Sequence, residues 1–136
     1  MCISIGRFLY RHTKFRSTSI RHGRIRLRLY IADTLIKQSI GLMYKRSLPR
    51  NTGMLFVLRR ESALGIWMLN MRFSIDILWL DRSGAVMHIV ENAEPCASVF
   101  SCHVYRPHKP AKYVLELGAG RAKSLGIRKG SRLLMP

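Results

Sequence analysis

The stretch Arg24-Ile25-Arg26-Leu27-Arg28-Leu29-Tyr30-Ile31 decides the fold class of this chain of 136 residues. Apolar and polar side chains alternate through it, which is the period-two pattern of a half-buried β-strand. The aliphatic positions are expected to face the core: Ile25, Leu27, Leu29 and Ile31. Because such a strand must pair with others to satisfy its backbone, the pattern predicts a β-rich domain.

Further apolar runs of strand length follow along the chain. They cover residues 54–58, 64–68, 75–80, 85–90, 112–117 and 133–135. Asp81-Arg82-Ser83-Gly84 predicts a hairpin loop, since glycine adopts the positive φ of a tight turn. One helix is expected between the N-cap signal Asp33-Thr34 and Pro49, and a single helical turn at residues 122–125. We therefore predict a mainly β, single-domain antiparallel β-sandwich or barrel with one or two short helices.

The chain is strongly basic, because 24 Lys and Arg against 7 Asp and Glu give a net charge of +17. Residues 1–20 are predicted to form a mobile basic arm, or alternatively an Arg- and Ser-rich transit peptide, and residues 21–136 the folded domain. No run reaches the ~18–20 apolar residues of a membrane helix. We expect a cytoplasmic protein whose charge favours polyanionic partners, nucleic acid or an anionic surface.

Seven pieces of the chain, in order, resemble one family of prokaryotic proteins. They are Gly41-Leu42-Met43-Tyr44-Lys45-Arg46, Gly53-Met54-Leu55-Phe56-Val57, Trp67-Met68-Leu69-Asn70-Met71, Ile75-Asp76-Ile77, Pro95-Cys96, Tyr113-Val114-Leu115-Glu116-Leu117 and Gly120. The family is the domain of unknown function 192 (DUF192), and the resemblance spans about residues 25–135. It implies a single all-β domain of jelly-roll-like type. It implies no activity and no catalytic residue, and its members often look exported or membrane-anchored.

Asp76 and Glu116 are carboxylates inside apolar runs. Burial raises the pKa of a carboxyl group, and a neutral carboxyl beside an ionised one is the acid/base pair of many hydrolytic sites. The alternative is structural, with each carboxylate accepting hydrogen bonds from backbone amides of a neighbouring loop. The two residues are thus candidate catalytic groups or structural ones.

Trp67 and Asn70 lie a few residues before Asp76, in a segment that ends an apolar run. A few polar groups among apolar and aromatic side chains are typical of small-ligand pockets. We expect a ligand site formed by Trp67, Asn70, Asp76 and Glu116, and we expect Asp76→Asn to change ligand affinity more than stability. Ordinary core packing is the competing interpretation.

Cys96, Cys102, His103 and His108 form a cluster in the long connection of residues 91–111. Thiolates and imidazoles are preferred zinc ligands, but the spacing differs from the common zinc signatures. We therefore predict no metal, and two free thiols, with a Cys96–Cys102 disulfide if the protein is oxidised. No cofactor motif is present, and no cofactor is expected.

A row of arginines is the strongest candidate for polyanion contact. Arg24, Arg26 and Arg28 recur at every second residue, about 6.7 Å apart along a strand. Lys45, Arg46, Arg59 and Arg60 are further contributors. Tyr10, Phe15 and Tyr30 are the aromatic residues among these basic ones, so any nucleic-acid binding should be independent of sequence.

Taken together, these patterns favour a non-catalytic binding domain with a small concave ligand site and a basic surface for polyanions. One alternative is a small hydrolase-like enzyme that uses Asp76 and Glu116. The other is a nonspecific binder of nucleic acid or of the ribosome surface.

Overall fold

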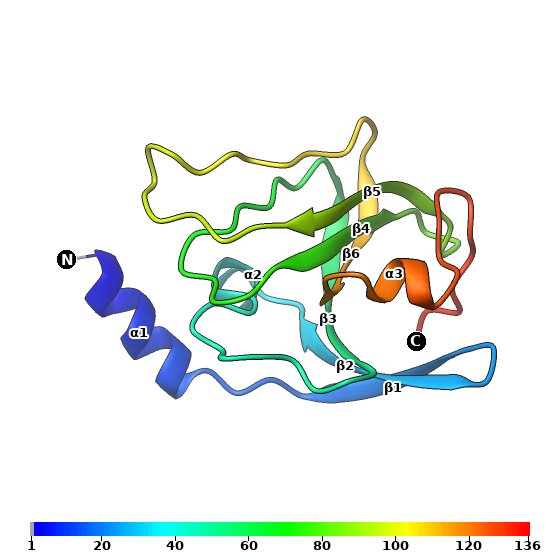
Figure 1. Cartoon of the computed structure of the whole chain (residues 1–136), viewed down its shortest axis with the longest axis horizontal. Coiled ribbons are helices and arrows are strands. Elements are labelled where there is room, and N and C mark those ends of the chain that lie inside the picture. The colour runs from blue at the N-terminus through cyan, green and yellow to red at the C-terminus, as the bar shows by residue number, and fades with distance from the viewer. Residues whose placement is uncertain (1) are drawn as a thin grey trace.

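The computed structural model describes residues 2–136, with side chains described from Arg7 onward. Its six strands form a single sheet in the order β1-β2-β3-β6-β4-β5 (Figure 1). The strands are β1 Ser17–His22, β2 Ile25–Ala32, β3 Thr52–Ser62, β4 Ile75–Leu80, β5 Val86–Ala93 and β6 Ala111–Gly118, and the helices are α1 Cys2–His12, α2 Leu35–Ile40 and α3 Arg121–Ser124. The predicted fold class, a mainly β single domain with short helices, is confirmed.

One pair of strands makes the sheet mixed. β2 and β3 run parallel, whereas β1–β2, β3–β6, β6–β4 and β4–β5 are antiparallel. Parallel strands need a crossover connection, and here α2 with the turns after it supplies that connection. Thr34 begins α2 as predicted, because its hydroxyl accepts a hydrogen bond from the Lys37 N–H at 3.2 Å.

The predicted strand and hairpin are both present. Leu27 and Leu29 are fully buried in β2, as the alternation indicates. The β4–β5 hairpin turns at Asp81, whose carboxylate accepts the N–H groups of Ser83 and Ala85 at 2.8 and 3.0 Å. Gly84 has φ +83°, and a Cβ there would lie 2.1 Å from the Leu133 carbonyl oxygen, so only glycine fits this turn.

The N-terminal region differs from the prediction. Residues 17–20, assigned to the basic arm, belong to β1, which pairs with β2 along its whole length. Ile20 is 5% exposed and lies opposite Leu27 in the core. Residues 2–12 form α1 at the end of the molecule away from the C-terminus (Figure 1), and residue 1 lies outside the described residues. An edge strand that buries one aliphatic side chain has too weak a pattern to be recognised.

Two predicted strands are reduced to isolated bridges. Residues 64–68 contribute the bridge Ile66↔Tyr105, and the C-terminal run contributes Ala85↔Arg132. Both segments still pack, because Ile66, Met68 and Leu133 are buried. These two segments pack against the faces of the sheet but do not extend it as strands.

Each face of the sheet carries its own apolar core. On one face Leu78 and Leu115 pack with Ala122 of α3. On the other, Phe56 and Trp79 pack beneath α2 and the segment around Ile66. Since side chains alternate along each strand, the parity of a residue decides which core it joins.

Candidate ligand-binding site

A cavity of about 220 Å³ opens on the face of the sheet beneath α2. Its floor is the sheet, with Phe56 of β3, Ile75 of β4 and Glu116 of β6, and its walls are α2, the turn after it and residues 64–67. Glu116 lies between Met54 and Ile77 on the neighbouring strands, so its side chain projects to this face. The cavity is therefore largely apolar, with one carboxyl group at its floor.

The Glu116 carboxyl is unusual in its environment. The residue is 3% exposed, and Oε2 is the atom that lacks a hydrogen-bond partner among the buried side-chain nitrogens and oxygens of the described residues. Burial raises the pKa of the Glu116 carboxyl to about 8. At neutral pH most molecules thus hold a protonated, neutral Glu116 facing the cavity.

Gln38 and Gly41, in and after α2, shape the wall of the cavity. The Gln38 amide donates to the carbonyl oxygens of Ala32 and Val57, both at 3.2 Å, and ties α2 to β2 and β3. Gly41 follows α2 with φ +50°, and a Cβ at this position would lie 3.3 Å from Phe56 Cζ and 4.0 Å from Glu116 Oε2. A glycine here leaves the approach to the carboxyl free of side-chain atoms.

Trp67 marks the mouth of the cavity, where its side chain is 38% exposed. The segment that carries it is held by two backbone hydrogen bonds between Ile66 and Tyr105, of 2.8 and 2.9 Å. The Trp79 indole N–H donates to the Leu64 carbonyl at 2.9 Å and fixes the other end of this segment. The structure thus brings together Trp67 and Glu116, two of the four predicted pocket residues.

The other two predicted pocket residues, Asp76 and Asn70, do not line this cavity. Asp76 is fully buried and does not line this cavity; its two carboxylate oxygens accept the N–H groups of Asn92 and Ala122, each at 3.0 Å. Asn70 adopts φ +59° in a turn, where its carbonyl accepts the Tyr44 N–H at 3.0 Å. Asp76 faces the α3 side of the sheet and Glu116 the α2 side. The hydrolase-like alternative is therefore wrong in its geometry, since the two carboxylates share no cleft.

Sequence reasoning missed Gln38, Gly41 and Phe56 as parts of this site. Gly41 was a recognisable signal, because a glycine directly after the last turn of a helix often marks a special backbone conformation. Gln38 and Phe56 gave no such signal, since their roles depend on strands far away in sequence.

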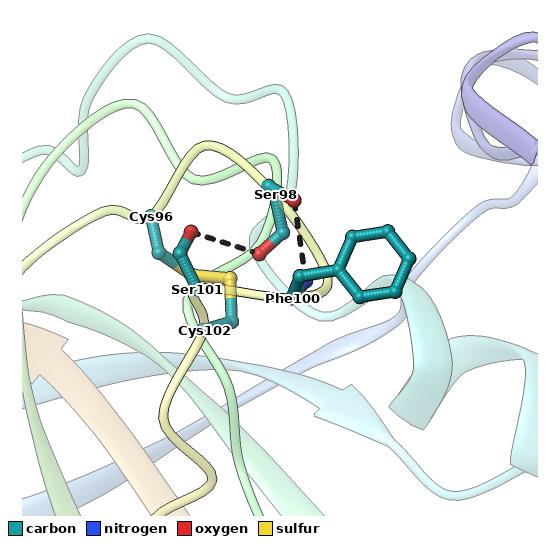
Figure 2. The surroundings of a disulfide bond; sticks show 5 residues. All are labelled: Cys96, Ser98, Phe100, Ser101 and Cys102. Atoms are coloured by element: carbon teal, nitrogen blue, oxygen red, sulfur yellow. Dashed lines mark hydrogen bonds between the residues drawn. A yellow bond between two sulfur atoms is a disulfide. The ribbon is translucent and has the colours of Figure 1, made fainter.

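The Cys96 and Cys102 side chains form a disulfide, with their Cα atoms 5.4 Å apart, so the expectation of two free thiols is corrected (Figure 2). A turn at Ser98 brings them together. Its hydroxyl accepts the Phe100 N–H at 3.2 Å, and its carbonyl accepts the Cys102 N–H at 3.0 Å. Phe100 projects from this loop away from the disulfide and is 98% exposed (Figure 2).

The two histidines of the cysteine–histidine cluster, which was predicted to bind no metal, pack against different rings. The His103 ring packs edge-on against Tyr105, with centroids 4.7 Å apart, and the His108 ring packs against His88 at 5.0 Å. Burial lowers the pKa of His88, and the nearby His108 and Lys129 lower it further. Among the described residues, no group of three or more His, Cys, Asp and Glu side chains is arranged to hold a metal ion.

The arginine row, defined as Arg24, Arg26 and Arg28, lies exposed at the β1–β2 hairpin. Arg26 stands opposite Arg21 of β1, which extends the same basic face. Lys45 lies over the Tyr30 ring, with Nζ 5.0 Å from the centroid, and Arg28 lies 5.6 Å from it. Arg46, the fifth predicted contributor, is exposed after Lys45.

A second concavity, which we call the tyrosine groove, continues from the arginine row. It has a volume of about 310 Å³ and is lined by Tyr10, Arg11, Thr13, Phe15, Tyr30 and Lys45. The three aromatic residues that the sequence singled out among the basic ones therefore meet in one place.

No helix among the described residues has the length and apolar character that a membrane crossing requires.

Comparison with curated proteins finds relatives in archaea. The chain is 31% identical over 111 residues to the UPF0127 protein PF1050 of Pyrococcus furiosus, covering 80% of this chain and 87% of the relative. It is also 31% identical over 111 residues to the UPF0127 protein TK1120 of Thermococcus kodakarensis, again covering 80% of this chain. In that case the match spans 62% of the relative's own length.

Two crystal structures share the fold. One is a proposed transcription regulator from Sinorhizobium meliloti 1021, with a TM-score of 0.80 and 29% identity over 90% of this chain and 96% of the other. The second is a protein of unknown function from Novosphingobium aromaticivorans DSM 12444, with a TM-score of 0.77 and 28% identity over 89% of this chain and 85% of the other. The model of the DUF192 family, described as "Uncharacterized ACR, COG1430", matches residues 17–135, and the chain belongs to this family.

Proposed function

We propose that this protein is a binding domain whose cavity takes a small, largely apolar ligand that donates a hydrogen bond to Glu116. The observation that carries the proposal is the unpartnered Oε2 atom at the floor of an otherwise apolar cavity. A buried polar atom without a partner costs about 1–3 kcal/mol, and a ligand that supplies the partner recovers that free energy on binding.

A ligand donor can pair with Glu116 in both of its protonation states, and a ligand acceptor in the neutral state alone. A ligand N–H or O–H group can pair with Oε2 whether the carboxyl is neutral or ionised, whereas an acceptor requires the carboxyl proton on that oxygen. A primary amine adds a further gain, because its positive charge stabilises the ionised form of Glu116 in a medium of low dielectric constant. Apolar walls such as Leu42 and Ile66 suit the hydrocarbon part of such a ligand.

The test is a series of ligands of one shape: cyclohexylmethylamine, cyclohexylmethanol and cyclohexanecarboxylate. Binding is followed by NMR shifts and by the fluorescence of Trp67, which Trp67→Phe separates from that of Trp79. We expect the amine to bind most tightly and the carboxylate least. In calorimetry, binding of the amine at neutral pH should release the Glu116 proton to the buffer, because the carboxyl becomes ionised beside the positively charged amine.

Two variants make this test specific. Glu116→Leu should abolish the preference for the amine, and Glu91→Gln, which changes an exposed Glu of β5, should retain it. Equal binding of the three ligands to the native protein, or an unchanged preference in Glu116→Leu, would contradict the role of Glu116.

We propose, as a second function, that the basic face of the β1–β2 hairpin binds polyanions. The arginine row supports this, since its three guanidinium groups lie exposed on a stretch, residues 1–32, that contains no acid. Replacing Arg24, Arg26 and Arg28 together by Gln should lower the slope of log affinity against log salt concentration by about 2.7 on duplex DNA, if each contacts a phosphate. An unchanged slope would show that the row makes no phosphate contacts.

The proposed binding of polyanions also favours a cytoplasmic location for the protein, because nucleic acid is an abundant polyanion in the cytoplasm. In that compartment glutathione and thioredoxin reduce disulfides, so a cytoplasmic location requires that the Cys96–Cys102 disulfide of this structure be open to reduction in the cell. Rapid alkylation of intact cells before lysis tests the location: two alkylated cysteines support the cytoplasm, and a trapped disulfide supports an oxidising compartment.

A further inference from the structure

We propose that the polyanion is a single-stranded nucleic acid, which lies along the arginine row and stacks a base in the tyrosine groove. This inference rests on the polyanion binding proposed above and adds the class of partner. It concerns a surface separate from the Glu116 cavity.

The groove joins four elements of the chain. Tyr10 and Arg11 come from α1, Phe15 from the segment before β1, Tyr30 from β2, and Lys45 from the turns after α2. The Tyr10 ring also packs against Tyr44, with centroids 5.7 Å apart. Aromatic side chains from separate elements thus border one open concavity, which is the arrangement on which an unpaired base can stack.

Positive charges are placed beside these rings. The Arg28 and Lys45 side chains lie over Tyr30, and the Arg7 guanidinium lies 5.9 Å from the Tyr44 ring centroid. A cation over an aromatic face gains about 0.5–1 kcal/mol at exposed sites, so it can exchange this contact for a phosphate at small cost. The same cations can therefore pair with phosphates when a base occupies the ring.

The arginine row leads directly to the groove. Residues of equal parity on β2 share one face, so Arg26, Arg28 and Tyr30 follow each other at about 6.7 Å intervals. From Arg26 to Tyr30 this face of β2 spans about 13 Å, and Arg24 extends it into the β1–β2 turn, which suits a few nucleotides of an extended strand. Binding sites for single strands on small domains begin at about 4 nucleotides.

The acidic residue near this surface is paired with basic side chains, and two others lie at the far edge of the sheet. The nearest acid in sequence to Tyr30 is Asp33, whose carboxylate pairs with Arg16 at 2.8 Å and Lys37 at 3.6 Å. Arg16 and Lys37 lower the pKa of Asp33, which therefore stays ionised and neutralised by its partners. Glu91 and Glu94 lie at and beyond β5, on the opposite edge of the sheet from β1.

The aromatic residues favour a single strand over a duplex or a lipid surface. In duplex DNA the bases are already stacked and paired, so a duplex could use the arginine row but not the groove. A lipid surface would be met by exposed apolar side chains such as Phe8 of α1, but the groove itself is bordered by Tyr10, Phe15 and Tyr30, which are half-buried.

The experiment measures binding of the full chain to four probes: an oligothymidylate of about 12 nucleotides, an abasic strand of equal length, a duplex of equal length, and vesicles with anionic lipid. We expect the oligothymidylate to bind about tenfold more tightly than the abasic strand, since one stacked base contributes ~1–3 kcal/mol. Tyr10→Ala and Tyr30→Leu should remove this difference and leave the abasic strand unaffected. Tyr105→Leu, outside the groove, is the matched control and should preserve it.

The outcomes separate the inference from the proposal on which it rests. If the oligothymidylate and the abasic strand bind equally, and the arginine-row variant weakens both, the surface binds polyanions and the inference of a stacked base is overturned. If the duplex or the vesicles bind more tightly than the oligothymidylate, the partner class is wrong. If none of the four probes binds, polyanion binding itself is wrong.

Discussion

Asp76 and Glu116 lie on adjacent strands, one register step apart, with their side chains on opposite faces of the sheet. Ile77, the residue after Asp76, is the partner of Glu116, and Leu117, the residue after Glu116, is the partner of Asp76. Partners across a pair of strands share a face, and neighbours along a strand do not. Two carboxylates in similar apolar runs therefore have different roles.

The hydrogen bonds of the two carboxylates show this difference. Asp76 accepts two backbone N–H groups, from Asn92 at the register shift between Val90 and Ala93 of β5 and from Ala122 in α3, and so ties two segments to β4. Glu116 Oε2 accepts none. Asp76 has the bonding pattern of a structural residue, and Glu116 that of a residue available to a ligand.

Asp76→Asn is expected to reduce stability and to leave the cavity unchanged, which reverses the sequence-based expectation. The amide of Asn can accept only one of the two N–H groups and places its own NH₂ against the other. The free energy of unfolding should fall by about 2–3 kcal/mol, as for other buried bonds to a charged group. Urea denaturation measures this, and unchanged stability with altered ligand affinity would restore the original interpretation.

Glu116 should make stability depend on pH in a defined direction. Its pKa rises from 4.5 to about 8 on folding, so the unfolded chain loses the proton at lower pH than the folded chain does. The contribution of Glu116 to the free energy of unfolding is therefore greatest below pH 4.5. As the pH rises from there to about 8, the free energy of unfolding falls by about 1.4 kcal/mol per pH unit. Denaturation curves across this range should show the decline in the native protein and a flatter profile in Glu116→Gln. Parallel profiles would show that Glu116 ionises normally in the folded state.

Replacing Cys96 and Cys102 together by Ser should have a limited effect on the fold. The disulfide closes a short loop, since the cysteines are six residues apart, and loss of such a constraint costs about 2 kcal/mol. Because the Ser98 hydrogen bonds remain, the loop should keep its turn and the two cores should be unaffected. Thermal unfolding with and without reductant provides the comparison; a loss of cooperative unfolding would mean that the loop organises the domain.

Two truncated chains should distinguish the contribution of α1 to stability from that of β1. A chain that begins at Thr13 loses α1 but keeps the whole sheet, and its stability should change little. A chain that begins at Gly23 loses β1 and the buried Ile20, whose apolar surface alone contributes about 2 kcal/mol, and it exposes the edge of β2. Denaturant curves of both chains test this, and equal stability would show that β1 behaves as part of a dispensable arm.

Local sequence patterns were sufficient to predict several elements of the fold. The alternation in residues 24–31 identified β2 and its buried face, Thr34 identified the start of α2, and Asp81 with Gly84 identified the β4–β5 hairpin. In each of these elements the side chain's neighbours along the chain supply the physical cause, so a short window of sequence contains it. Of the four residues predicted to form a ligand site, Trp67 and Glu116 line the cavity beneath α2, and their role in binding stays a prediction.

Features that depend on strand register and on distant contacts could not be predicted from such patterns. Whether Asp76 and Glu116 meet depends on the pairing of β4 with β6, which are far apart in the chain. The cavity exists because α2 and residues 64–67 cover the strand that carries Glu116. β1 was missed because its one buried side chain has its partner in β2, and the Cys96–Cys102 pair depends on a turn that no residue pattern specified. These features are set by relative positions in space, and a one-residue shift of register would place each side chain on the other face.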